Sequence, residues 1–401
     1  MTNSASSDHL LNRPLELPCG AVIKNRLVKS AMSDSLADGE GDPTDAQARL
    51  YERWAEGGLG LSIIGEVQVD PRFPEKPGNL VLSADSDLKA LHSLASRAST
   101  NGAHIWPQLG HAGGLSYLSI SQPKGPSALK IGGFRCAGMS DTEVSQLPDM
   151  YARAAILAKD VGFTGVQIHA GHGFLLSQFL SPLFNRRKDQ YGGSIEARCR
   201  IIVEIIDKVR SAVGASFPIG IKINSSDQLE GGLTQEDALE AIRILDQTSI
   251  DLIELSGGSY FPGAKSSSDS SSRGPYFVEF SEKAKSLTSI PLVVTGGFKT
   301  REQALNSLAN GTVDSVGLAR ALVLNPELAN DWLAGTSDKP DFPRFEAPPQ
   351  GGITAWYTMF LTAIGNDSES NFDLDLSSAI HLYEERDENR CVTWQRKFSR
   401  F

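Results

Sequence analysis

The chain carries a strand–helix–strand pattern in Gly165-Val-Gln-Ile-His169, Ala197–Ala212 and Pro218-Ile-Gly-Ile-Lys-Ile-Asn224. The first and third segments are short and rich in β-branched residues, whereas the middle segment repeats its apolar side chains with the spacing of an amphipathic helix. A strand, a crossover helix and a second strand form a βαβ unit, whose two strands pair in parallel. This stretch therefore predicts an α/β fold with a parallel sheet.

The same pattern recurs along the chain. Runs such as Leu61–Ile64 are apolar nearly throughout, which is typical of parallel strands covered on both faces. Eight strands with intervening helices in 401 residues favour a (β/α)8 TIM barrel over a doubly wound sheet. The six further candidate strands are residues 26–32, 60–67, 103–109, 250–256, 291–295 and 313–318. Further helical patterns occupy residues 150–160, 235–247, 277–287 and 301–309.

The sequence shows no linker that would separate a second domain, so we expect one domain over residues 1–401. The barrel would occupy about residues 20–335 after a short N-terminal lead-in, and about residues 340–401 would form a C-terminal extension. We expect this extension to pack on the barrel or on a neighbouring subunit, which leaves a homo-oligomer open. Its large aromatic residues include Trp356, Tyr357 and Trp394. A Ser-rich segment, residues 265–273, is expected as a loop on the catalytic face.

Composition excludes several classes of function. The sequence has 38 basic and 48 acidic residues, a net charge of −10, and such a chain attracts neither nucleic acid nor anionic lipid. No apolar run reaches the ~18 residues that a membrane span needs, and Met1–Leu10 lacks the apolar stretch of a signal peptide. The four cysteines include no C-x-x-C pair, which argues against a Cys-rich zinc or iron–sulfur site. We therefore expect a cytoplasmic enzyme with a small-molecule substrate.

Polar side chains gather at the ends of the candidate strands, where (β/α)8 barrels place their active sites. The clearest pair is His169 and His172, which follow the fourth strand. Two N–H groups at a barrel mouth can donate hydrogen bonds to a developing oxyanion. A metal site is a second interpretation, although no third ligand stands nearby in the sequence, and two structural histidines are the third. The spacing alone leaves these interpretations open.

Five motifs occur in an order that resembles a known family. Over about residues 12–335 the chain resembles the old yellow enzymes, which are flavin-dependent NAD(P)H:enone oxidoreductases. Its histidine pair is similar to that of the bacterial and fungal branch with shortened loops. The motifs are Asn25–Ser33, Gln108–Gly113, His169–Glu196, Thr295–Phe298 and Gly317–Arg320.

The resemblance implies FMN, bound tightly but non-covalently across the barrel mouth, with NADPH or NADH as the hydride donor. Gln108 can both donate to and accept from the pyrimidine edge of the flavin. Lys222 would place a cation near flavin N1, and an ion pair at the barrel mouth is the alternative role for it. Glycines and Arg320 after the last two strands match the usual phosphate site of these barrels. The implied FMN-binding residues are Ser30, Ala31, Met32, Ser33, Val67, Gln108, Lys222, Gly296, Gly297, Gly317, Ala319 and Arg320.

The resemblance also implies catalytic roles. His169 and His172 would hydrogen-bond the carbonyl oxygen of an α,β-unsaturated substrate, while hydride passes from flavin N5 to its β-carbon. The family usually has a proton-donating tyrosine two residues after the second histidine, where this chain has Phe174. Phenylalanine has no proton to give, so water or another acid must supply it. The candidate donors are Tyr117, Tyr260 and Tyr357.

These observations favour an FMN-dependent ene-reductase. The change at Phe174 keeps a second reaction open, in which an FMN enzyme isomerises or desaturates an enone-bearing metabolite without that proton. A flavin-binding redox sensor is a third interpretation. A flavin-free aldolase is a fourth, because Lys222 stands at a strand end, as a Schiff-base lysine would.

Overall fold

Eight parallel strands close into a barrel in this computed structural model, which describes residues 9–131, 133–261 and 274–399. The strands follow one another around the barrel in chain order, and β13 pairs with β3 to close it. This closed barrel confirms the predicted (β/α)8 fold, and all eight candidate strands are present. Their bounds are β3 (Leu27–Lys29), β4 (Leu61–Gln68), β5 (His104–Gly110), β9 (Val166–Ala170), β10 (Ile219–Asn224), β11 (Leu252–Ser256), β12 (Leu292–Thr295) and β13 (Ser315–Leu318).

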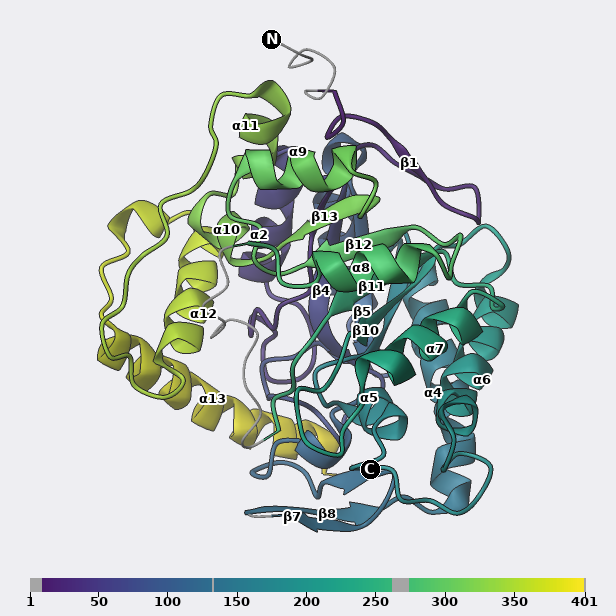
Figure 1. Cartoon of the computed structure of the whole chain (residues 1–401). Coiled ribbons are helices and arrows are strands. Elements are labelled where there is room, and N and C mark those ends of the chain that lie inside the picture. The colour runs from purple at the N-terminus through teal and green to yellow at the C-terminus, as the bar shows by residue number, and fades with distance from the viewer. Residues whose placement is uncertain (1–8, 132, 262–273, 400–401) are drawn as a thin grey trace.

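Helices surround the barrel, and at least one follows each strand (Figure 1). The predicted helices agree with the structure except at the start of α4, which begins at Asp141 rather than at residue 150. Ser140 and Glu143 form a capping box there, which starts the helix well before Pro148. The helices are α2 (Asp45–Glu56), α3 (Leu88–Ala98), α4 (Asp141–Asp160), α6 (Ile195–Val213), α7 (Gln235–Leu245), α8 (Val278–Lys285), α9 (Arg301–Ala309) and α10 (Arg320–Leu324). Short 3-10 turns lie at Thr100–Gly102, Gly113–Leu115 and Glu369–Asn371.

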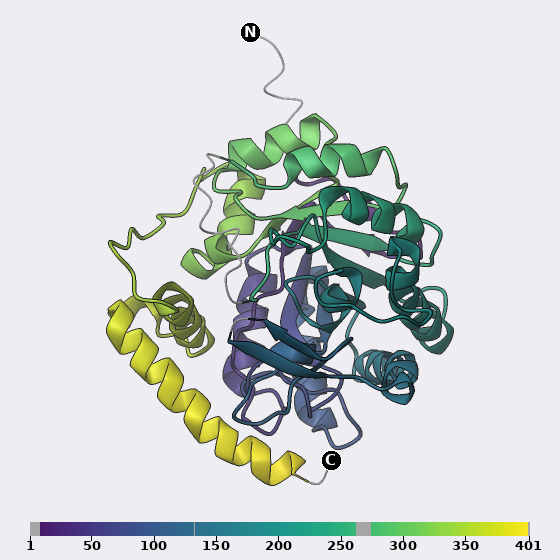
Figure 2. The same cartoon turned by 60° about the horizontal axis from the view of Figure 1, so that its bottom comes forward.

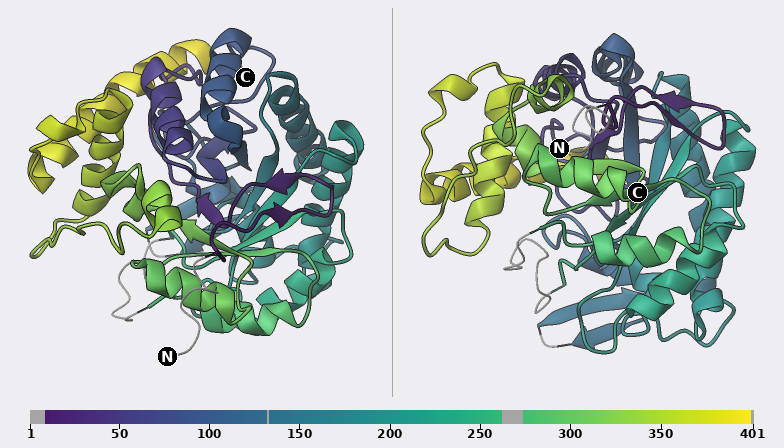
Figure 3. Two further views of the ribbon diagram at one scale, coloured as in Figure 1. Left: turned by 90° about the horizontal axis from the view of Figure 1, so that it is seen from above. Right: turned by 45° about the horizontal axis from the view of Figure 1, so that its top comes forward.

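A small hairpin covers the N-terminal end of the barrel. It consists of β1 (Leu15–Glu16) and β2 (Val22–Ile23), which pair antiparallel. Its apolar side chains join a cluster with residues at the starts of barrel strands, including Leu61 and Leu252. Figure 3 shows the hairpin lying across this end. The opposite end, where the strands have their carboxyl ends, is therefore the end left for a site.

The loops at the carboxyl end carry extra structure. Between β5 and α4 lies a three-stranded sheet of β6 (Lys124–Gly125), β7 (Leu129–Ile131) and β8 (Phe134–Gly138), in the order β6–β8–β7. A short helix, α5 (Leu175–Leu180), follows β9. Figure 2 shows the small sheet in front of the barrel at this end. The Ser-rich segment 265–273 lies outside the described residues.

The C-terminal extension packs on the barrel of its own chain. It comprises α12 (Gly352–Gly365) and α13 (Leu376–Phe398), which follow α11 (Leu328–Ala334), and α12 packs against α2. Near the end of α13, the indole N–H of Trp394 donates to the carbonyl oxygen of Pro71 at 3.1 Å. Figures 1 and 2 show α13 running along one side of the carboxyl end. Within the described residues, no helix combines the length and apolarity needed to cross a membrane.

We expect Trp394→Ala to lower the free energy of unfolding by about 3–5 kcal/mol, because it empties a buried aromatic site. Trp394 is 1% exposed and packs with Phe398 at a ring-centroid distance of 4.7 Å. Val392 on the same helix is 69% exposed, so Val392→Ala should change stability by less than about 0.5 kcal/mol. Urea unfolding measures both. Equal effects would show that α13 is not docked through Trp394.

Candidate active site

A chain of hydrogen bonds crosses the barrel interior beneath its carboxyl end. The side-chain amide of Gln108 on β5 donates to Gln167 on β9 at 2.7 Å, and Gln167 donates to Glu254 on β11 at 2.7 Å. Thr295 at the end of β12 also donates to Glu254 at 2.7 Å, and its hydroxyl lies 2.6 Å from that of Ser30. Side chains on β5, β9 and β12, and Ser30 just after β3, are thus connected to the carboxylate of Glu254 on β11. Sequence reasoning named Gln108 and Ser30, but it missed Glu254.

Lys222 on β10 forms the ion pair that the sequence left as its alternative role. Its ammonium lies 3.1 Å from Glu254 Oε1, and both side chains are fully buried. Burial acts to raise the pKa of Glu254, but the Lys222 charge and the hydrogen bonds from Thr295 and Gln167 outweigh it and lower the pKa. The Glu254 carboxyl is therefore ionised at neutral pH.

The two histidines lie together at the carboxyl end of the barrel. Their ring centroids are 5.2 Å apart, with His169 ending β9 and His172 in the following loop. His172 has φ 59°, and its amide N–H donates to the side chain of Asn224 at 3.0 Å. Its Nε2 lies 2.9 Å from the hydroxyl of Ser256. Asn224 thus holds His172 in a left-handed backbone conformation that is uncommon for residues other than glycine, and Ser256 contacts its ring.

Both histidines are neutral at pH 7. Burial lowers the pKa of His169 to about 3, helped by the charge of Lys222. Burial also lowers the pKa of His172, and His169 and Lys222 lower it further. The amide N–H of Gly171 approaches His169 Nδ1 at 3.4 Å, which assigns the ring proton to Nε2. Each ring can therefore offer one N–H donor, as the oxyanion interpretation requires.

Glu66 is a site residue that sequence reasoning missed. It lies on β4 with 6% exposure and φ 54°, and its Oε1 is 3.0 Å from His169 Nε2. This contact does not meet hydrogen-bond geometry, and His169 Nε2 is buried without a hydrogen-bond partner among the described residues. The other carboxyl oxygen, Glu66 Oε2, is likewise buried without such a partner there. The available signal was an acidic residue near the end of an apolar strand. Val67, the next residue and a predicted FMN contact, packs in the main apolar core.

Phe174 is the N-cap residue of α5 and lies beside the histidines. It is 2% exposed, and its ring lies 5.3 Å from that of His169 and 5.6 Å from that of Tyr260. Tyr260 also lies 5.8 Å from His172. The other two candidate donors have different neighbours, since Tyr357 packs on Arg320 and Tyr117 packs on Lys76. The structure therefore brings one of the three tyrosines next to the histidine pair.

Ser33 lies in a polar cluster that follows β3. Its hydroxyl donates to Glu75 at 3.1 Å and accepts from the side chain of Asn79 at 3.1 Å. Burial and the nearby Glu66 carboxyl raise the pKa of Glu75 to about 7. Ala31 and Met32, just before Ser33, are half-buried. A Cβ at Gly65 would come within 2.2 Å of the Met32 carbonyl oxygen, so glycine lets these two segments cross.

The predicted phosphate segments meet at the ends of β12 and β13. Gly296 and Gly297 have φ of 116° and 85°, which glycine adopts without strain. A Cβ at Gly317 would lie 2.0 Å from the Thr295 hydroxyl, so only glycine fits there. Ala319 precedes α10, whose first residue Arg320 packs 5.7 Å from the ring of Tyr357.

These residues fit FMN. Among the described residues, Glu66 Oε2 and His169 Nε2 are buried without hydrogen-bond partners, the basic residues Lys222 and Arg320 stand on β10 and α10, and the glycines allow close backbone approach. Among the described residues, no group of three or more His, Cys, Asp or Glu side chains is arranged to hold a metal ion.

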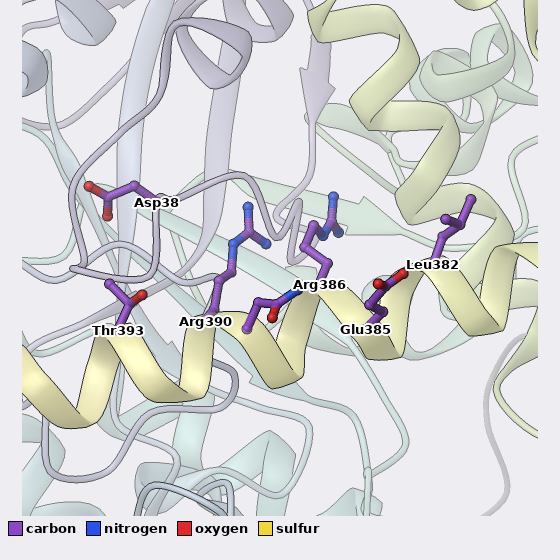
Figure 4. A pocket seen from close by; sticks show the side chains of 7 residues that line it. Asp38, Leu382, Glu385, Arg386, Arg390 and Thr393 are labelled. Carbon is purple, nitrogen blue, oxygen red and sulfur yellow. The ribbon is translucent and has the colours of Figure 1, made fainter.

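A separate cavity of about 340 Å³ lies along α13, and Figure 4 shows Arg386 and Arg390 projecting from one side of that helix. Arg390 donates to the backbone carbonyl of Ser35 at 2.7 Å, so the extension reaches the segment that follows β3.

We expect Lys222→Met to lower the free energy of unfolding at pH 7 by about 3–5 kcal/mol, because it leaves the buried Glu254 carboxylate unpaired. Adding Glu254→Gln should recover most of the lost free energy of unfolding, because it removes the unpaired charge. Because the Glu254 pKa is lowered on folding, the stabilisation is present above the unfolded pKa and is lost as pH falls through the folded one.

Lys208→Met is the matched control, since Lys208 pairs with Asp149 at 2.8 Å in an exposed position and should contribute less than about 1 kcal/mol. Urea unfolding of wild type and the three variants gives the comparison. A loss at Lys222 no larger than at Lys208, or no recovery in the double variant, would contradict this account.

The chain is similar in sequence to known flavin oxidoreductases. The model of the NADH:flavin oxidoreductase / NADH oxidase family matches residues 11–338. The NADH-dependent flavin oxidoreductase iliE of Hypocrea jecorina (strain QM6a) is 34% identical over 385 residues, 85% of this chain and 95% of that protein. The protein of the same name from Neonectria sp. (strain DH2) is 35% identical over 362 residues, which are 79% of this chain but 46% of that protein. The chain thus spans about half the length of some curated relatives.

The fold has solved counterparts. The old yellow enzyme homologue from Zymomonas mobilis superposes with a TM-score of 0.73 at 23% identity, covering 87% of this chain and 99% of the other. At this identity the superposition supports the barrel alone, whereas the family match carries the assignment. The chain therefore belongs to the NADH:flavin oxidoreductase family, that of the old yellow enzymes, whose cofactor is FMN and whose hydride donor is NADH or NADPH.

Proposed function

We propose that this protein is an FMN-dependent NAD(P)H oxidoreductase that acts on an α,β-unsaturated carbonyl compound. The observation that carries the proposal is the neutral pair of His169 and His172 at the carboxyl end of the barrel, beside the buried side chain of Lys222. When bound, reduced FMN supplies hydride to the β-carbon of the substrate. The two imidazoles would donate hydrogen bonds to the carbonyl oxygen, where negative charge then develops.

The predicted FMN-binding residues would each contact a different part of the cofactor. Residues 30–33 would pass along the flavin ring, Gln108 would meet its pyrimidine edge, and Lys222 would place a positive charge near N1. The glycines after β12 and β13 would approach the phosphate with their backbone N–H groups, and Arg320 would pair with it. The contact of Lys222 with Glu254 fixes its position and argues against a free Schiff-base lysine.

A second candidate function is favoured by Phe174. Phe174 occupies the position of the family's tyrosine, beside His169. An isomerase or a desaturase needs no proton donor there, so either reaction is consistent with the site. Net consumption of NADPH with a saturated product distinguishes the reductase from both.

His169→Ala should lower kcat/KM for an enone by about 10²–10³-fold, because it removes one donor to the developing oxyanion. His92 is the control: it lies on α3, 3.2 Å from the Val161 carbonyl oxygen and away from the barrel mouth, so His92→Ala should change the rate less than threefold. Steady-state oxidation of NADPH with a panel of enones measures both variants after their FMN content is matched. An unimpaired His169→Ala enzyme would remove the proposed role of the pair.

A further inference from the structure

Glu66 has no role in the function described so far, yet its carboxyl lies within the site. Its Oε1 is 3.0 Å from His169 Nε2, the nitrogen that would hold the substrate oxygen. Its Oε2 is buried and lacks a hydrogen-bond partner among the described residues. Gly110 leaves room for this oxygen, since a Cβ there would approach it to 3.0 Å. The carboxyl is therefore held in a buried position with one oxygen uncommitted.

The surroundings keep this carboxyl protonated. Burial raises the pKa of Glu66 to about 8, against the opposing effect of Lys222. The other ionisable groups that face it are His169, Glu75, Tyr151 and Tyr260. The histidine is neutral, and none of the rest carries positive charge. Glu66 thus enters a reaction at pH 7 with a proton to give.

We propose that Glu66 is the acid that delivers the substrate proton in place of the tyrosine that Phe174 replaces. The proposal rests on the proposed function. A carbonyl oxygen bound to His169 Nε2 has its α-carbon two bonds away, and Glu66 Oε1 lies 3.0 Å from the same nitrogen, so the carboxyl would stand near that carbon. Hydride addition at the β-carbon leaves an enolate, and its electron pair takes the Glu66 proton to form the α C–H bond. The O–H bond breaks, and water reprotonates the carboxylate before the next turnover.

Tyr260 is the competing donor, and two observations favour Glu66. Tyr260 is 70% exposed and meets the site through ring contacts with His172 and Phe174. A phenol with an ordinary pKa near ~10 is also a weaker acid than this carboxyl. Tyr260→Phe therefore belongs in the test as the rival variant.

The test separates the two halves of the catalytic cycle by anaerobic stopped-flow absorbance of the FMN-loaded protein. NADPH reduces the flavin first, and 2-cyclohexenone, or the best of an enone panel, then reoxidises it. Glu66→Gln should leave reduction within threefold of wild type but slow reoxidation by about 10²–10⁴-fold, the usual contribution of a general acid. Glu75→Gln, at the neighbouring buried carboxyl, and Tyr260→Phe should each change reoxidation less than threefold. Adding Phe174→Tyr to Glu66→Gln should recover at least tenfold.

A binding measurement gives a readout that does not depend on turnover. We titrate 4-hydroxybenzaldehyde into the FMN-loaded protein between pH 6 and 10 and follow the flavin absorbance. Ionised Glu66 would repel the bound phenolate from His169. Wild type and Glu66→Gln should bind it equally below pH 7, and wild type should be about tenfold weaker one pH unit above the Glu66 pKa.

The outcomes are distinguishable. If NADPH does not reduce the wild-type flavin, or no enone reoxidises it, the proposed function fails and the Glu66 role fails with it. If wild type completes the cycle and Glu66→Gln reoxidises at the same rate, only the Glu66 proposal is overturned. A large loss in Tyr260→Phe or Glu75→Gln without one in Glu66→Gln overturns it too, as do identical pH profiles of phenol binding.

Discussion

The fully buried carboxylate of Glu254 is the constraint on which the site depends. Ionised groups are buried only when they are paired and hydrogen-bonded, and Glu254 meets this condition through Lys222, Gln167 and Thr295. Each of these contacts fixes a side chain on a different strand. Through them, Glu254 sets the positions of Lys222, Gln108 and Ser30, three residues that the family resemblance assigns to the flavin.

Burial and the charge of Lys222 together determine the protonation of the histidines beside this pair. Burial is the larger cause that lowers both histidine pKa values, and Lys222 lowers them further, so both rings are neutral donors rather than cations. The charge of Lys222 also acts to lower the pKa of Glu66, but burial has the larger effect and the pKa stays raised, at about 8. The barrel mouth therefore combines neutral donors, a neutral acid and a buried ion pair, an arrangement suited to stabilising an enolate and then protonating it.

Much of this structure was predictable from the sequence, for identifiable reasons. The barrel strands are short apolar runs, and five stretches between them show amphipathic periods, so the (β/α)8 fold and most of its elements could be predicted. The histidine pair was also recognisable, because it stands directly after a strand. The start of α4 was predicted wrongly because Pro148 obscured the capping box of Ser140 and Glu143.

The roles of Glu66 and Glu254 in the site could not be predicted, because in the sequence each is a single acidic residue in an apolar strand. Only the closed barrel shows that Glu254 meets Lys222 across adjacent strands and that Glu66 turns toward His169 with φ 54°. The docking of Trp394 on Pro71 depends on contacts across 323 residues and likewise leaves no local signal.

The most direct test of the central claim is the visible spectrum of the purified protein without oxygen, recorded after NADPH is added and again after a conjugated enone is added. The account predicts a flavin band that bleaches with NADPH and returns with the enone. A protein without a flavin band, even after FMN is supplied, or a band that NADPH leaves unchanged, would contradict it.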